Sequence, residues 1–183
     1  MATMGNHGDW IGADRAARRL GVSRGSAVKL MDCGLLGPVV QRGNRTTVNS
    51  SAVDALAARP LVADHPPTTV IRMGVPVTED QGWRDRYGYH ETWSAQQKRD
   101  AIRGNWICDP FAVTDSGLLV AVVVLWVVAV YEVTGVDRRE WDPEAGRHRY
   151  RFSVRRPARD VASSFVGRRF EALDSGWVLK AVA

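Results

Sequence analysis

Cysteine and lysine are scarce in this 183-residue chain, which limits the metal sites it can form and the residue type that carries its positive charge. The two cysteines, Cys33 and Cys108, lie far apart, and neither stands in a Cys-x-x-Cys pair or beside a histidine at a zinc-binding spacing. We therefore expect reduced thiols, no metal and no cofactor. Lysine contributes only three of the 25 basic residues, so arginine supplies almost all of the positive charge.

Motifs for catalysis are also missing. The chain has no glycine-rich motif that cradles phosphate, no nucleophile elbow and no paired-histidine motif for a catalytic metal. Acidic residues such as Asp109, Asp115 and Glu132 flank an apolar stretch, but no Glu-x-Lys strand accompanies them as a nuclease would require. We expect no catalytic residue and no enzymatic activity.

The N-terminus lacks the basic and apolar segments of a secretory signal, and only one long uncharged run occurs, GLLVAVVVLWVVAVY at 117–131. This run is shorter than the ~18 residues that a membrane-spanning helix normally needs. Valine dominates it, and branching at Cβ favours strands. We predict two buried strands that turn near Leu125 and Trp126, with a membrane span as the alternative, in a cytoplasmic protein.

The overall composition is that of a folded protein, with 45% hydrophobic and 25% charged residues. The length suits one medium domain or two small ones, and we expect two. The net charge of +5 comes from an excess of arginine, whose guanidinium pairs bidentately with phosphate and with guanine. This favours a nucleic-acid partner, although a genomic bias toward arginine codons is the alternative.

Two short helices separated by a tight turn are predicted near the N-terminus. The first covers 14–20 and ends at Gly21, which suits a left-handed conformation. Ser23 is the expected N-cap of the second, which begins near Arg24 and stops at Gly34. This order of helix, glycine turn and capped helix is the plan of a helix-turn-helix.

A hairpin and a third helix follow. The strands are expected at 39–41 and 46–48, because a Gly-Asn turn lies between two β-rich runs. Ser50 or Ser51 is expected to cap a helix over 52–58, which ends before Pro60.

The stretch AARRLGVSRGSAVKLMDCGLLGPVVQRGNRTTVNSSAVDAL resembles the winged helix-turn-helix of the MerR and excisionase families. The resemblance covers about the first third of the chain and implies that the second helix enters the major groove while the hairpin wing lies on the neighbouring backbone or minor groove. Two departures from the family are Gly25 and the absence of a long dimerisation helix after Pro60. The implied contacts to double-stranded DNA are Arg24, Gly25, Ser26, Val28, Lys29, Arg42, Asn44 and Arg45.

The rest of the chain is expected to form a second domain. Pro66 and Pro67 favour extended chain, so we expect domains at 1–60 and 76–183 with a linker at 61–75. Aromatic residues alternate with arginine over 82–93, as in a base-stacking surface or, alternatively, a mixture of core and loop. A capping box at Ser94 predicts a helix through Arg103.

Strands dominate the C-terminal part of the prediction. A third strand approaches Trp141, a turn covers 142–146, and 147–154 alternates basic with aromatic or apolar residues, as a half-buried strand does. The basic side chains would form a second nucleic-acid surface, with a solvated face as the alternative. Its members are Arg147, Arg149, Arg151, Arg155, Arg156, Arg168 and Arg169.

These elements predict an α+β protein with a small mixed or barrel-like β domain after the winged helix-turn-helix. Segments such as Arg103-Gly104-Asn105-Trp106 and Phe165-Val166-Gly167-Arg168 weakly resemble barrel domains of the PUA, ASCH and EVE type. That resemblance implies a reader of RNA or of modified bases. A base or ligand pocket would then include Trp83, Trp106 and Trp126.

The sequence thus predicts a sequence-specific protein for double-stranded DNA, of bacterial or phage type and associated with the nucleoid. It would act as a transcriptional regulator or an excisionase-like architectural factor, with the C-terminal domain adding DNA affinity or forming a homodimer. A reader of RNA or modified bases and a protein-binding adaptor are the alternatives.

Overall fold

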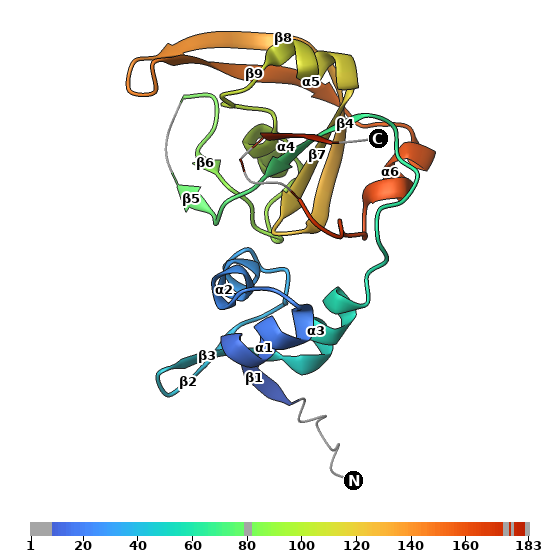
Figure 1. The fold of residues 1–183 in the computed structure, drawn as a ribbon. Helices are drawn as coiled ribbons and strands as arrows, with labels where there is room; N and C mark the ends of the chain where they lie inside the picture. The colour runs from blue at the N-terminus through green and yellow to red at the C-terminus, as the bar shows by residue number, and fades with distance from the viewer. Residues whose placement is uncertain (1–8, 79–81, 174–175, 177, 182–183) are drawn as a thin grey trace. The chain divides into compact units, whose positions relative to one another are not determined.

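A computed structural model describes residues 9–78, 82–173, 176 and 178–181 of the chain. The fold is α+β: a small three-stranded sheet with helices precedes a curled half-barrel sheet with helices (Figure 1). The chain divides into two compact units. Unit 1 comprises Met1–Arg59 with His90–Thr92, and unit 2 comprises Pro60–Tyr89 with Trp93–Ala183.

Two short helices of unit 1, α1 (Ala13–Leu20) and α2 (Arg24–Asp32), form where the sequence predicts them. Gly21 ends α1 in the left-handed conformation, with φ of 67°, and the N–H of Val22 closes the turn onto the Ala17 carbonyl at 3.1 Å. Ser23 then caps α2, because its hydroxyl oxygen accepts the N–H of Ser26 at 3.1 Å. The predicted helix, turn and helix are confirmed.

Three strands complete unit 1 in the order β1-β3-β2. The predicted hairpin consists of β2 (Val40–Arg42) and β3 (Arg45–Asn49), joined by Gly43 and Asn44. The strand β1 (Trp10–Gly12), which the sequence did not indicate, pairs antiparallel with β3. A three-residue strand is too short to show a period, so only its partner reveals it.

The third helix of unit 1, α3 (Ser50–Ala57), begins two residues earlier than predicted, and its cap is a correction. Asn49, rather than Ser50 or Ser51, accepts the N–H of Ser51 at 2.9 Å. The reason is that β3 continues to Asn49, which leaves this residue extended at the helix start. The buried side chains of the three helices and β3 are Ala16, Ala17, Ala27, Leu30, Met31, Thr47, Val48, Val53 and Leu56.

Unit 2 is built on a mixed five-stranded sheet in the order β10-β4-β7-β8-β9. Strands β4 and β7 are parallel, and every other neighbouring pair is antiparallel. A separate two-stranded pair, β5 and β6, lies outside this sheet. The bounds are β4 (Thr68–Arg72), β5 (Val77–Thr78), β6 (Arg86–Tyr87), β7 (Leu118–Val123), β8 (Trp126–Asp142), β9 (Arg147–Arg155) and β10 (Val178–Ala181).

Strand β4 lies inside the segment 61–75 that the sequence assigned to a linker. Val70 and Ile71 are fully buried between β7 and β10, so this part of the segment belongs to the core of unit 2. Pro66 and Pro67 end just before the strand, and the β-branched run that follows them favours pairing. The prolines therefore precede a central strand.

The valine-rich run forms β7 and the first part of β8, as predicted, with the turn at Val124 and Leu125, one residue earlier than expected. All six residues of β7 are buried, so both faces of this strand are covered. The expected third strand near Trp141 is instead the second half of β8. Register shifts around Gly135 let one strand of 17 residues bend without ending.

Three helices accompany the sheet of unit 2. The predicted capping box is present on α4 (Ala95–Ile102), where Ser94 and Gln97 satisfy each other's backbone N–H. Two further helices, α5 (Pro110–Ser116) and α6 (Arg159–Phe165), were not expected. Phe165 of α6 packs into a core cluster with Val70, Val120 and Val127. In the described part of the chain, no helix is both long and apolar enough to cross a membrane.

Candidate nucleic-acid interface

The residues predicted for groove contact lie outside the buried face of α2. Ala27, Leu30 and Met31 are buried and hold the helix against unit 1. Arg24 and Gly25 are exposed. The other three predicted residues, Ser26, Val28 and Lys29, are half-buried. The outer face of α2 therefore combines two cations with small and apolar side chains, which is the mixture that base edges require.

Arg24 of this face makes an ion pair with Asp14 of α1, with its Nε 3.2 Å from the carboxylate. Both side chains are 70% exposed, so water screens the pair and its contribution to stability is small. The Arg24 guanidinium can therefore leave Asp14 for another anion at little cost in stability.

The hairpin formed by β2 and β3 presents the other predicted contacts, and we call it the wing. Arg42, Asn44 and Arg45 are all exposed at its tip. The Arg42 guanidinium lies 5.5 Å from the centre of the Trp10 ring, and the Gln41 amide donates to the Thr46 hydroxyl at 2.8 Å. These cross-strand contacts orient the cationic tip.

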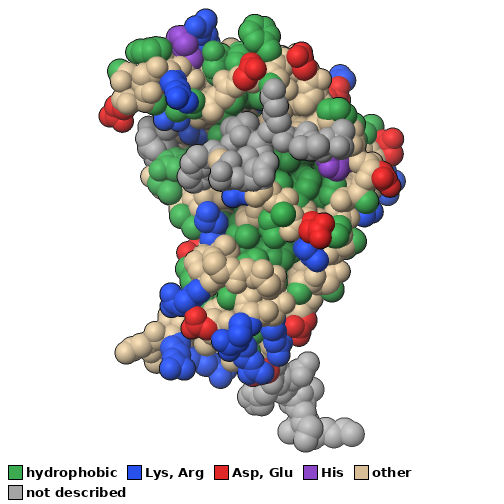
Figure 2. Space-filling view, viewed as in Figure 1, with side chains coloured by type: hydrophobic (Ala, Val, Ile, Leu, Met, Phe, Trp, Pro, Cys, Tyr) green, Lys and Arg blue, Asp and Glu red, His purple; other side chains and the backbone are tan. Residues whose placement is uncertain are grey.

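Positive charge is concentrated in unit 1. Residues 1–59 contain eight Arg and Lys but only four Asp. In the face that Figure 2 shows, Lys and Arg side chains gather over α1 and the base of the wing. Three of the arginines pair with an acid: Arg15, Arg19 and Arg24. Among the residues that the structure describes, no acidic ion-pair partner is present for Arg18, Lys29, Arg42, Arg45 and Arg59.

The first prediction concerns the Ser23 cap and its contribution to the stability of α2. Replacement of Ser23 by alanine removes the acceptor for the Ser26 N–H and is expected to lower the free energy of unfolding of unit 1 by about 1 kcal/mol. Ser23→Asp should retain the cap. Thermal unfolding followed by circular dichroism measures both, and equal melting temperatures for the two variants would contradict the role of the cap.

On the second predicted surface, acids of β8 pair with three of the four arginines of β9. Arg149 pairs with Asp142, Arg151 with Asp137 and Arg155 with Glu132. The Arg155 guanidinium holds the pKa of Glu132 below its usual range. The pKa of Asp142 is also lowered, mainly by the hydrogen bond from the Ala145 N–H and next by the one from the Arg149 guanidinium. These arginines are therefore part of a charge-balanced hairpin.

The remaining members of that surface are dispersed. Arg168 donates to the carbonyl oxygens of Ser163 and Leu61, at 3.4 and 3.2 Å. Arg147 and Arg156 are exposed, and Arg169 is half-buried. Residues 60–183 contain 17 Arg and Lys against 16 Asp and Glu, so this part of the chain is nearly neutral. The sequence contains the acids Glu132 and Asp137, but only the strand pairing shows that they meet Arg155 and Arg151.

The three tryptophans predicted to share a pocket are not brought together, which corrects that prediction. Trp126 is 1% exposed and belongs to the core. Trp83 is covered by guanidinium groups, with those of Arg84 and Arg151 at 4.8 and 4.7 Å from its ring centre. Only Trp106 lines the large cavity of unit 2. Tryptophan content predicts burial as readily as a binding wall.

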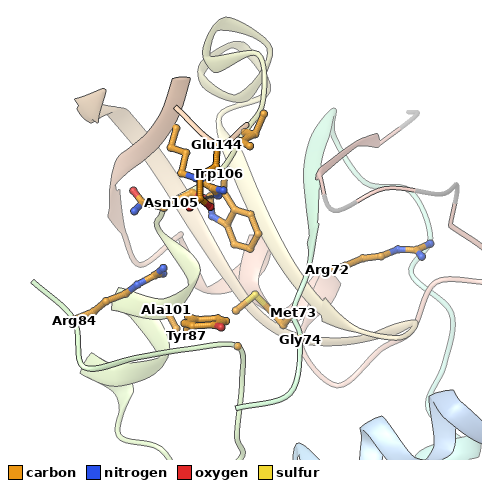
Figure 3. A pocket seen from close by; sticks show the side chains of 12 residues that line it. Arg72, Met73, Gly74, Arg84, Tyr87, Ala101, Asn105, Trp106 and Glu144 are labelled. Carbon is orange, nitrogen blue, oxygen red and sulfur yellow. Dashed lines mark hydrogen bonds between the residues drawn. The ribbon is translucent and has the colours of Figure 1, made fainter. Parts of the chain in front are cut away.

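The cavity itself has a volume of about 720 Å³, within the range of small-molecule sites. Figure 3 shows the Trp106 indole directed toward Met73 across this space. The guanidinium of Arg72 points away from the cavity and donates to the Leu173 carbonyl at 2.8 Å. Sequence reasoning missed most of the lining, because it comes from separate segments that carry no motif. Further lining residues are Tyr87, Ala101, Asn105, Ile107, Glu144 and Arg149.

Neither thiol is suited to nucleophilic chemistry. Burial raises the pKa of Cys33 to about 12 and that of Cys108 to about 11, so both stay protonated at neutral pH. Within the described ranges, no group of three or more His, Cys, Asp or Glu side chains could hold a metal ion.

Comparison of the chain with protein-family models, curated proteins and solved structures gave no match.

Proposed function

We propose that this protein binds double-stranded DNA through unit 1, which acts as a winged helix-turn-helix. In this proposal α1, the Gly21–Ser23 turn and α2 form the helix-turn-helix, and α2 enters the major groove. The wing lies along the neighbouring backbone. The biological role would be that of a transcriptional regulator or an architectural factor at a recombination site.

The observation that carries this proposal is the distribution of charge: residues 1–59 contain eight Arg and Lys against four Asp, whereas residues 60–183 contain 17 against 16 Asp and Glu. Lys29 on α2 and both arginines of the wing have no ion-pair partner among the described residues, whereas three of the four β9 arginines of unit 2 pair with acids. Cations that no protein group neutralises are available to replace the counterions of DNA phosphates. Unit 1 therefore supplies most of the electrostatic affinity.

The outer face of α2 would read bases. Arg24 and Lys29 are able to donate to guanine O6 and N7, and Val28 offers a methyl contact for thymine. The wing arginines contact phosphates, which fix the register but carry no sequence information. Specificity then depends on α2 and affinity on the wing.

Gly25 allows a test of whether the backbone of α2 closely approaches DNA. A Cβ at this position would meet only Ser23 Oγ, at 3.9 Å, so nothing within the fold requires glycine here. Gly25→Ala should raise the stability of α2 by up to ~1 kcal/mol and yet weaken DNA binding. Thermal unfolding and duplex titration measure the two effects, and a stabilised variant with unchanged binding would exclude backbone approach at this position.

The proposal as a whole is tested by selecting duplexes from a random library with the full-length protein. We expect one preferred sequence, bound about a thousand-fold more tightly than random DNA. Arg24→Ala should cost about 1–3 kcal/mol on the preferred duplex and relax the preference at one base pair. Arg138→Ala, which removes an exposed arginine of the unit 2 hairpin, is the matched control and should leave the preference intact. Selection of no sequence would overturn the proposed function.

A further inference from the structure

The cavity of unit 2 has a rigid, flat wall. The backbone of Trp106 pairs with that of Tyr150 through two hydrogen bonds, at 2.9 and 2.8 Å, and its indole N–H donates to the Ile102 carbonyl at 2.7 Å. These three bonds fix the ring plane. Met73 lies across from the indole in Figure 3 but is only 1% exposed, so the half-buried indole is the flat face on which a ligand could stack.

Polar groups from three separate segments line the same cavity. Asn105 adjoins Trp106, Arg149 comes from β9, and Glu144 comes from the loop between β8 and β9. Asp142 organises two of them: it accepts the N–H of Glu144 at 3.0 Å and pairs with the guanidinium of Arg149. Asp142 thereby anchors the backbone of Glu144 in the loop and the guanidinium of Arg149 on the adjoining strand.

The chemistry of this polar set is complementary to one kind of ring edge. Arg149 uses two of its N–H groups, toward Asp142 and the Asn105 carbonyl, so further donors remain among the five of a guanidinium. No bond from the side chains of Asn105 or Glu144 is present among the described residues. The set therefore offers donors from Arg149, acceptors from Glu144, and both from Asn105.

We propose that this cavity binds guanine, as a free nucleoside or as an unpaired base of a polynucleotide. Guanine places two acceptors, O6 and N7, beside each other for a guanidinium, and two donors, on N1 and the 2-amino group, for a carboxylate. Its flat ring can stack on the Trp106 indole. Adenine lacks the pair of donors that Glu144 would accept.

The test is isothermal titration of the full-length protein with guanosine, without duplex DNA. We expect saturable binding at one site, with adenosine about tenfold weaker or worse because one charged hydrogen-bond set is lost. Glu144→Gln should weaken guanosine by a similar factor. Glu140→Gln, on the same hairpin but outside the cavity, is the matched control and should bind as the unaltered protein does.

A second arm identifies the source of the base. A short single-stranded oligonucleotide with one guanine is compared with the same length of thymine alone. Binding of guanosine, or of the guanine-containing strand only, supports the site and assigns its ligand. Absence of both, or equal binding by Glu144→Gln at an unchanged melting temperature, would overturn the proposal. Arg24→Ala should leave guanosine binding unaltered, so this result is independent of duplex recognition by unit 1.

Discussion

Replacement of Arg42 and Arg45 together by alanine is expected to weaken binding to every duplex alike, by about 3 kcal/mol or roughly 150-fold. Both side chains are exposed on the wing, and neither has an acidic partner in the described part of the chain. Loss of two phosphate contacts should also reduce the slope of log K against log salt by about 1.8. Titration of duplexes at several salt concentrations measures both quantities.

A matched pair of arginines distinguishes this effect from a general loss of charge. Arg138 and Arg139 are exposed on β8 of unit 2, and their double replacement by alanine removes the same charge. We expect the salt slope to stay close to that of the unaltered protein. Lysine at positions 42 and 45 should preserve the slope, because phosphate responds to the charge. If the unit 2 variant matched the wing variant, the interface would extend over both units.

The second large effect concerns Trp126. Its replacement by alanine is expected to lower the free energy of unfolding of unit 2 by about 3–5 kcal/mol, since a fully buried indole leaves a cavity that the sheet cannot close. Trp126 is 1% exposed at the start of β8, and it forms a bridge with Arg169 of the C-terminal segment. Urea unfolding followed by circular dichroism measures the change.

Trp141 on the same strand is the control. It is 55% exposed, so Trp141→Ala should change the unfolding free energy by less than about 1 kcal/mol. Because the chain has two units, the unfolding of each must be resolved before the values are compared. A mild effect of Trp126→Ala would contradict its place in the core.

In unit 1, local signals in the sequence were sufficient. Gly21 and Ser23 mark the turn and cap between the helices, and Gly43 with Asn44 marks the hairpin. Each of these acts within a few residues, so a single sequence contains the whole signal. Strand β1 was missed because its only evidence is a partner about 40 residues away.

In unit 2, the sequence predicted individual strands but not which of their side chains meet. Alternation predicted the strand that begins at Arg147, but it could not show that Asp142, Asp137 and Glu132 would lie opposite the arginines of this strand. Register decides which charges meet, and register depends on how a whole sheet assembles.

The sequence also left the cavity of unit 2 unpredicted, because its lining depends on how the whole sheet assembles. The scarcity of lysine and of paired cysteines determined that arginine carries the charge and that no Cys-x-x-Cys metal site is encoded. Only the tertiary structure decided which cations stay unpaired and which tryptophan lines a cavity, because both depend on contacts between residues far apart in the chain.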